Sequence, residues 1–348
     1  MSRLPDESDF RSRPSRRGTR PRTKQRPAHE HAVTGMVTGV DRGRYTLLVD
    51  EDGPDERVVL AMKARELSRD RVVCGDRVDV VGDASGEKDT LARIVRIGER
   101  ATVLRRTADD TDPYERIVVA NADQLVIVTA LANPEPRTGL IDRAVVAAYD
   151  AGMDVLLCLT KADLASPDEL RGLYEPIGAR VVVTHRTADR EIVGLDAVRA
   201  ELAGRTSVLL GHSGVGKSTL VNALVPDAGR ATGHVNDVTG RGRHTSTSAV
   251  ALRLPGDAGA GWVVDTPGIR SFGLAHVQVA DVLRGFDDLD EVAAERCPRG
   301  CTHLADAPDC ALDEWADESD DAAVRDVRHL RLDSFRRLVA ARSVSDRD

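Results

Sequence analysis

The sequence has few aromatic residues and no long hydrophobic run. Aromatic side chains make up 3% of its 348 residues, so any core must be built mainly from Val, Leu, Ile and Ala. No apolar stretch approaches the roughly 18 residues that a membrane-spanning helix requires. The first residues also lack the apolar segment of a secretory signal. We therefore expect a protein with no membrane partner.

Cysteine is scarce as well. Three of the five cysteines cluster near the C-terminus. This usage fits a reducing compartment with a metal site better than a disulfide framework, so we expect a cytoplasmic protein. Cys74 and Cys158 lie within apolar strand patterns, and we interpret both as core residues.

The net charge of −8 is unevenly distributed along the chain. Residues 1–30 hold nine Lys/Arg and four Asp/Glu, whereas the remainder holds 40 and 53. Because the first segment is rich in Arg and Pro and almost free of apolar residues, we predict a disordered basic arm over residues 1–31. Such an arm can follow a phosphate backbone. A solubilising tail without a partner is the alternative.

Residues 211–218, with the sequence GHSGVGKS, form the most informative segment. They stand between an apolar strand pattern and a helical pattern, which is the setting that the G-x-x-x-x-G-K-[ST] phosphate loop requires. Backbone N–H groups and the helix N-terminus attract phosphates. Lys217 would reach the outer phosphates and Ser218 would bind Mg²⁺. The nucleotide-binding residues predicted here are Gly211, His212, Ser213, Gly214, Val215, Gly216, Lys217, Ser218 and Thr219.

An apolar run over residues 155–159 ends in Thr160-Lys161-Ala162-Asp163. A carboxylate at Asp163 can accept two hydrogen bonds from guanine, which adenine cannot offer. The stem of Lys161 can lie along the base. We predict that Thr160, Lys161 and Asp163 bind the nucleotide. An ordinary helix N-cap at Asp163 is the alternative.

A second apolar run ends in Asp265-Thr266-Pro267-Gly268. An acidic residue at a strand end before a turn is typical of a Mg²⁺ contact and of a loop that senses the γ-phosphate. We therefore predict that Asp265 and Gly268 belong to the nucleotide site. The base-reading motif then precedes the phosphate loop, whereas in ordinary GTPases it comes last. A doubly wound sheet tolerates this circular permutation because its strands keep their neighbours.

The chain resembles the circularly permuted, small-ribosomal-subunit-dependent GTPases of the RsgA (YjeQ) family over roughly residues 33–340. Four further segments carry the resemblance: Asn121-Ala122-Asp123-Gln124, Leu140-Ile141-Asp142-Arg143, Gly242-Arg243-His244-Thr245 and Cys297…Cys301-Thr302-His303…Cys310. The resemblance implies subunit-stimulated hydrolysis of GTP to GDP, and the small ribosomal subunit and its rRNA as partners. Thr160 stands where the family usually has Asn, so a hydroxyl replaces an amide.

Three folded domains are predicted after the arm, and we expect a monomer. Residues 32–104 contain five short strand-like runs, which predict an OB-fold barrel that binds RNA; an inert SH3-like spacer is the alternative. Residues 105–286 alternate strand and helix patterns, which predict an α/β P-loop GTPase domain with a parallel sheet. Residues 287–348 are predicted to form a small, mostly α-helical zinc domain with a helical tail.

Within residues 105–286 the polar, Gly-rich link between Val225 and Ala249 is typical of a mobile switch loop. We expect strands at 124–129, 155–160, 181–184, 208–211, 250–254 and 262–265, and helices at 141–149, 168–174, 195–202 and 217–224.

The C-terminal motif Cys297-x₃-Cys301-x-His303-x₆-Cys310 offers three thiolates and one imidazole. This set is sufficient for one closed, structural, tetrahedral zinc ion. Free thiols near a surface histidine are the alternative. The resembling family usually has a first cysteine pair one residue wider, so we expect a local loop change at Cys301. A helical pattern follows, whose arginines either face solvent or contact RNA: Arg328, Arg331, Arg336 and Arg337.

Hydrolysis needs a positioned water and stabilised phosphoryl charge. Ile269 follows the Asp-x-x-Gly turn and can do neither, and the resemblance implies His244 instead. We predict His244, Lys217 and Thr245 as catalytic, with Ser218, Asp265 and Thr245 holding Mg²⁺. Thr247 is the alternative to Thr245.

The leading hypothesis is a GTPase that binds the small ribosomal subunit late in its maturation and leaves after hydrolysis. One alternative is a zinc-containing rRNA-binding scaffold that uses guanine nucleotide as a conformational ligand. Another is an ATP-dependent enzyme of some other process.

Overall fold

The computed structural model describes residues 29–106, 116–226, 249–257, 259–266, 274 and 277–341. Ala32–Asp348 forms one compact unit, distinct from Met1–His31. Most of the predicted basic arm lies outside the described residues. The same holds for five residues considered for catalysis, magnesium or the switch turn: His244, Thr245, Thr247, Gly268 and Ile269.

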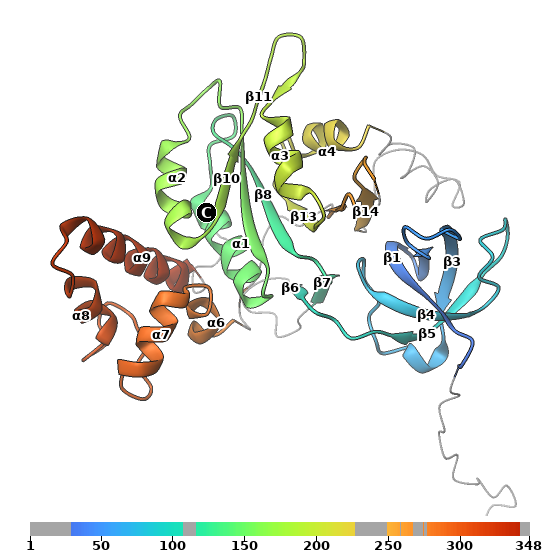
Figure 1. Cartoon of the computed structure of the whole chain (residues 1–348), viewed down its shortest axis with the longest axis horizontal. Coiled ribbons are helices and arrows are strands. Elements are labelled where there is room, and N and C mark those ends of the chain that lie inside the picture. Colours follow the sequence, from blue (N-terminus) through green and yellow to red (C-terminus); the bar gives the residue numbers. More distant parts are fainter. Residues whose placement is uncertain are drawn as a thin grey trace, which may run out of the picture. The chain divides into compact units, whose positions relative to one another are not determined.

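A five-stranded barrel comes first in the chain (Figure 1). Its strands are β1 (Val33–Asp41), β2 (Arg44–Val49), β3 (Arg57–Lys63), β4 (Arg77–Gly82) and β5 (Ala92–Ile97), with the short 3-10 helix η2 (Arg65–Leu67) after β3. They pair in the order β1-β2-β3-β5-β4, and a β1–β4 pairing closes the barrel. Side chains such as Val37, Leu47 and Ile94 fill the interior and are fully buried. The predicted five-stranded barrel is confirmed.

The next part is built around a mostly parallel sheet. Its strands are β8 (Gln124–Ala130), β9 (Asp154–Thr160), β10 (Arg180–Val183), β13 (Thr206–Leu210), β14 (Val250–Arg253) and β15 (Trp262–Asp265). They lie in the order β10-β9-β8-β13-β15-β14, and β14 alone among them runs antiparallel to its neighbour in this sheet. All six strands expected from the apolar runs are present.

Helices cover both faces of this sheet. They are α1 (Thr138–Asp150), α2 (Asp168–Tyr174), α3 (Leu195–Leu202) and α4 (Lys217–Leu224). Leu125 of β8 packs in a core with α1 and α2, whereas its neighbour Val126 packs in a second core with α3 and α4. This alternation explains why the strand is apolar at every position, since both of its faces are buried. All four expected helices are present.

Two short hairpins are not anticipated by the sequence. One pairs β6 (Val103–Arg106) with β7 (Arg116–Ala120), and the other pairs β11 (His185–Arg186) with β12 (Ile192–Val193). The strands of both hairpins are too short to show a hydrophobic period.

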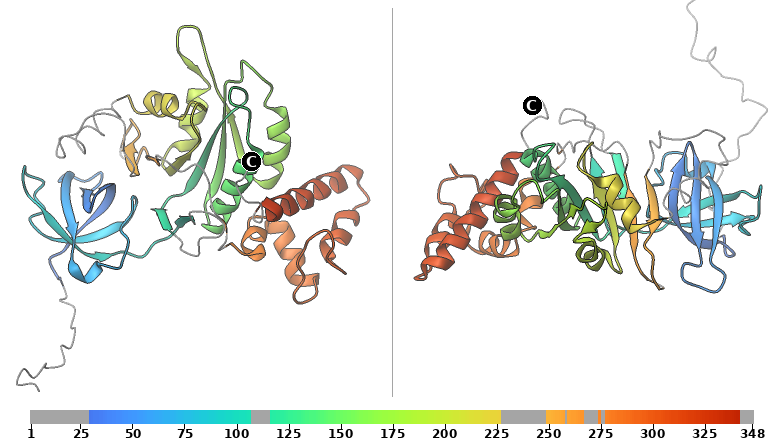
Figure 2. Two further views of the ribbon diagram at one scale, coloured as in Figure 1. Left: turned by 180° about the vertical axis from the view of Figure 1, so that it is seen from behind. Right: turned by 90° about the horizontal axis from the view of Figure 1, so that it is seen from above.

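Helices make up the C-terminal part, namely α6 (Val279–Leu283), α7 (Asp287–Arg296), α8 (Ala311–Asp317) and α9 (Ala322–Ala341). α9 packs against α1 and against the 3-10 helix η3 (Glu175–Ile177) (Figure 2). The Phe286 ring makes edge contacts with Tyr149 and Phe335, at centroid distances of 6.1 and 5.7 Å. The C-terminal helices thus share a core with the α1 face of the sheet. Within the described ranges, every helix is too short or too polar to cross a lipid bilayer.

The four arginines of α9, for which the sequence leaves a solvated face or an RNA contact open, make contacts within the protein. Arg331 binds the Asp288 carboxylate and Arg336 binds Asp313. Arg328 lies over the Trp315 ring, and Arg337 pairs with Asp142 of α1. These cations therefore hold α9 against its neighbours, which sequence spacing could not reveal.

Candidate functional site

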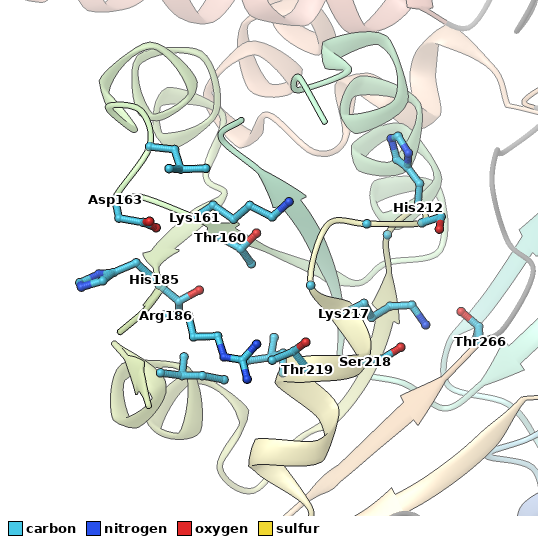
Figure 3. A pocket seen from close by; sticks show the side chains of 18 residues that line it. Thr160, Lys161, Asp163, His185, Arg186, His212, Lys217, Ser218, Thr219 and Thr266 are labelled. Atoms are coloured by element: carbon cyan, nitrogen blue, oxygen red, sulfur yellow. The ribbon is translucent and has the colours of Figure 1, made fainter. Parts of the chain in front are cut away.

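A cavity of about 680 Å³ lies at the carboxyl ends of the parallel strands (Figure 3). Ligands of open α/β sheets bind at this edge. The base loop (residues 160–163) and the phosphate loop (residues 211–218) both line it, although they are far apart in sequence. The predicted residues in its wall are Thr160, Lys161, Asp163, Gly211, His212, Ser213, Gly214, Gly216, Lys217, Ser218 and Thr219. Val215 is buried, and Asp265 lies beside the cavity as a partner of Lys217.

The phosphate loop leads directly into α4. Gly216 caps this helix with a φ of +95°, a backbone conformation that residues with a Cβ rarely adopt. Leu220 and Leu224 anchor α4 in the core, so its first-turn N–H groups stay directed at the cavity. The Lys217 ammonium donates to Asp265 Oδ1 at the end of β15. Two predicted ligands, one for phosphate and one for Mg²⁺, are therefore in direct contact.

The base loop is tied to the phosphate loop by Thr160. Its hydroxyl is buried and donates to the backbone oxygen of Val215 at 2.6 Å. Lys161 has a φ of +58°, and its ammonium donates to the Asn133 carbonyl. Asp163 is exposed, and its carboxylate lies at the end of the cavity opposite Lys217 (Figure 3). The distribution of charge suits a nucleotide, with a hydrogen-bond acceptor at one end and a cation at the other.

His212 lies at the phosphate end of the cavity. Burial lowers the pKa of its imidazole, and the positive charge of Arg137 lowers this pKa further. The imidazole is therefore neutral at pH 7. The fixed positive charge at this end comes from Lys217.

One wall of the cavity is not anticipated by the motifs. It consists of residues at and after the end of β10, namely Thr184, His185, Arg186 and Ile192. In the sequence, only the position of these residues could have indicated their role. Residues that follow the carboxyl end of a parallel strand commonly line such a site.

One of the segments that resemble the RsgA family, residues 121–124, holds the fold together away from the cavity. Asn121 donates to the Gly75 carbonyl at 2.9 Å and accepts from the Ala101 N–H at 2.8 Å. The buried amide of Gln124 donates to Ser207 Oγ at 2.8 Å. These side chains join the barrel to the first strand of the sheet and pair adjacent strands, so their role here is structural.

A cluster of three cysteines and one histidine lies between α7 and α8. All four ligand atoms lie within 4.8 Å of one another, and the cluster consists of Cys297, Cys301, His303 and Cys310. His303 Nδ1 lies 3.5 Å from Cys297 Sγ and 3.8 Å from Cys310 Sγ. Metal–sulfur bonds of about 2.3 Å and metal–nitrogen bonds of about 2.0–2.1 Å, at tetrahedral angles, place such atoms about 3.5 Å apart. The cluster can therefore hold a metal ion.

The local backbone explains how the narrow first spacing is accommodated. The Cys301 N–H bonds to the Pro298 carbonyl at 3.1 Å, and His303 has a φ of +55°. Burial and the neighbouring thiols raise the pKa of Cys310 to about 11, whereas burial and Arg336 lower the pKa of His303. The imidazole is thus neutral, as a metal ligand must be.

Comparisons with known proteins agree with this geometry. The family model of the RsgA GTPase matches residues 97–275. The small ribosomal subunit biogenesis GTPase RsgA of Gemmatimonas aurantiaca is 35% identical over 306 residues, which cover 86% of this chain and 96% of that protein. The protein of the same name from Pseudomonas syringae pv. tomato is 36% identical over 277 residues, covering 78% of this chain and 75% of that protein.

Solved structures show the same fold. The structure of YjeQ from Thermotoga maritima matches with a TM-score of 0.60 at 24% identity, and covers 88% of this chain and 99% of its own. YloQ, described as a circularly permuted GTPase, matches with a TM-score of 0.58 at 23% identity, covering 89% of this chain and 97% of its own. The predicted permuted P-loop fold is confirmed. The chain belongs to the RsgA family of GTP-hydrolysing P-loop enzymes.

Proposed function

We propose that this chain acts in maturation of the small ribosomal subunit, binding the subunit in its GTP form and leaving after hydrolysis. The observation that carries the nucleotide part is the meeting of the base loop and the phosphate loop across one cavity. The choice of the small ribosomal subunit as partner is supported by relatives named small ribosomal subunit biogenesis GTPase. One of them is matched over 96% of its length.

We propose one role for each group of the cavity. Asp163 accepts from guanine, and the stem of Lys161 lies along the base. Lys217 binds the outer phosphates, while Ser218 and Asp265, together with Thr245, hold Mg²⁺. Bound magnesium supplies charge neutralisation on the phosphates. Lys217 and Asp265 form an ion pair, and this contact supports the proposal that one would hold the phosphates and the other Mg²⁺.

For hydrolysis, His244 orients the attacking water and Lys217 stabilises the developing phosphoryl charge. His244 belongs to the segment between α4 and β14, which follows the phosphate loop and α4 in sequence. We propose that contact with the subunit brings this histidine to the water, which makes turnover depend on the client. Gly268 completes the turn after Asp265 that senses the γ-phosphate.

The other domains have roles in binding the small ribosomal subunit. We propose that the Cys₃His cluster holds one structural zinc ion, and that the barrel and the basic arm bind rRNA. The proposed limits are 1–31 for the arm, 32–104 for the barrel, 105–286 for the GTPase domain and 287–348 for the zinc domain. The zinc domain follows the Asp265 turn in the chain, so nucleotide state and subunit contact can influence each other. The protein acts as a cytoplasmic monomer.

Measuring GTP turnover with purified ribosomal subunits tests the proposal. We expect small subunits to raise turnover well above the free rate, and large subunits to have much less effect. The GTP form should co-sediment with small subunits, the GDP form should not, and added salt should weaken the association. Equal stimulation by both subunits, or none by the small one, would contradict the proposal. Co-sedimentation without stimulation would favour a scaffold instead, and effective competition by ATP would remove the guanine assignment.

A further inference from the structure

The β11–β12 hairpin (residues 185–193) forms an ordered wall of the nucleotide cavity. Its turn is fixed by hydrogen bonds from the Thr187 N–H to the Glu191 carbonyl at 2.9 Å, and from the Arg190 N–H to the Thr187 carbonyl at 3.0 Å. At its far end Gly194 has a φ of +86°, and a Cβ there would lie 2.2 Å from the Val183 oxygen. The hairpin therefore returns tightly onto β10.

This hairpin is also tied to the base loop. The Ala162 N–H donates to the Thr184 carbonyl at 3.2 Å, and the Thr184 N–H donates to the Leu159 carbonyl at 2.7 Å. Thr184 immediately precedes the hairpin, so the position of the hairpin is set by the same backbone that presents Asp163. A side chain on the hairpin is consequently held in register with the bound base.

Arg186 and Ile192 are directly paired across the hairpin. Cross-strand partners project from the same face, and both residues line the cavity. Arg186 is exposed, and its side chain has no hydrogen bond or ion pair with any described residue. Figure 3 shows its side chain running from the hairpin toward Thr219, in the first turn of α4.

The position of Arg186 along the cavity indicates which part of a bound nucleotide it contacts. Asp163 lies at one end of the cavity, and Lys217 and Ser218 lie at the other (Figure 3). In the proposed assignment these are the ends for the base and for the outer phosphates. A nucleotide spanning these ends places its ribose and α-phosphate between them. A guanidinium gains more from an anion than from a neutral hydroxyl, because charge-assisted hydrogen bonds are roughly twice as strong.

We propose that Arg186 binds the α-phosphate of the guanine nucleotide and so sets nucleotide affinity without taking part in hydrolysis. The inference rests on the proposed nucleotide assignment of the cavity. The α-phosphate is common to GTP, GDP and GMP, so Arg186 strengthens all three by the same factor. An interaction that is equal in the ground and transition states changes KM and leaves kcat unchanged.

The test compares nucleotides with and without a phosphate, by calorimetry on the full-length chain. Arg186→Ala should weaken GTP, GDP and GMP by about tenfold each, as expected for loss of one charged hydrogen bond. Guanosine affinity should stay within about twofold, and Arg186→Lys should restore part of the loss. KM for GTP should rise while kcat is retained.

Arg190→Asn is the matched control, since it removes a positive charge from the same hairpin and Asn tolerates its φ of +71°. It should leave all affinities unchanged. Unchanged GDP affinity in Arg186→Ala, an equal loss for guanosine, or an equal loss in the control would each overturn the inference. If the wild-type chain binds no guanine nucleotide, the nucleotide assignment itself fails, and this inference fails with it.

Discussion

Arg337 of α9 lies with Nε 3.3 Å from Oδ2 of Asp142 in α1, and so joins the last described helix to the nucleotide-binding domain. The Asp142 side chain is 6% exposed and that of Arg337 is 29% exposed. Tyr174 completes the group, because its hydroxyl donates to Asp142 Oδ1 at 2.8 Å and its ring lies under the guanidinium.

Arg337→Met should destabilise the fold in a pH-dependent way. Burial raises the pKa of Asp142, and Arg337 and Tyr174 only partly oppose this rise. Without Arg337 a buried carboxylate loses its cation, which should lower the free energy of unfolding by about 2–3 kcal/mol at pH 7.5. Urea denaturation measures this loss.

The sign of the pH effect follows from the raised pKa. The folded state binds the Asp142 proton more tightly than the unfolded state, so this group's contribution to stability is present at acid pH and is lost as pH rises through the folded pKa. The variant's pKa is higher still, so its deficit should shrink at about pH 5. Arg199→Met, which breaks an exposed pair with Asp196, is the control and should cost less than about 1 kcal/mol. A deficit independent of pH would contradict the assignment.

Asp163→Asn should change the base preference from guanine to xanthine. The amide presents a donor where guanine also donates, whereas xanthine offers an acceptor there. GTP affinity should fall by at least about tenfold while xanthosine triphosphate affinity rises. Competition binding measures both. Asp168→Asn at the start of α2, away from the cavity, should change neither. Similar affinities of the wild-type chain for ATP and GTP would refute the role of Asp163.

The sheet and the two loops could be predicted because their signals are local. Apolar runs such as β8 are buried on both faces, and the glycines of the phosphate loop fit only a tight turn before a helix. The Cys₃His cluster is likewise compact in sequence, and the structure brings its four ligand atoms together.

Contacts between distant segments could not be predicted. The pairing of Arg337 with Asp142, and the place of Arg186 in the cavity wall, depend on how separate elements pack. A helical pattern shows which residues are polar, and does not show whether an arginine meets solvent, RNA or a buried carboxylate. The strands of the β11–β12 hairpin are too short for a hydrophobic repeat to predict them from the sequence.

Thr160→Val should weaken nucleotide binding although the residue keeps its shape. The change removes the 2.6 Å hydrogen bond to the Val215 carbonyl and leaves that oxygen unpaired between the two loops. An unpaired buried acceptor costs about 1–3 kcal/mol, which favours a shift of the two loops in the free protein. GDP binding must then restore their arrangement, so GDP affinity should fall by about tenfold. Thr102→Val is the control, because its hydroxyl makes a comparable bond of 2.7 Å to the Ala122 carbonyl and Thr102 does not line the cavity. Equal effects of the two variants would show that Thr160 has no special role.

His244→Ala should retain GTP binding and lose most of the stimulated hydrolysis. Positioning of the attacking water is worth about 10²–10⁴-fold in rate. Single-turnover hydrolysis with small subunits measures the loss, and calorimetry checks that GTP affinity is kept. His234→Ala removes a histidine from the same segment of the chain and should leave stimulated turnover unchanged. Near-normal turnover in His244→Ala would move the water-positioning role to another residue.

Cys310→Ser should abolish zinc binding and loosen the C-terminal helices. Cys310 is buried directly before α8, in the same core as Leu312 and Phe335, so the metal and the local packing depend on each other. Elemental analysis should give one zinc per wild-type chain and about none in the variant. Proteolysis should then cut first in the residues around α7 and α8, while GDP binding is largely retained. Cys74→Ala, a buried cysteine outside the cluster, should keep the zinc. A wild-type chain purified without chelator and free of zinc would refute the assignment.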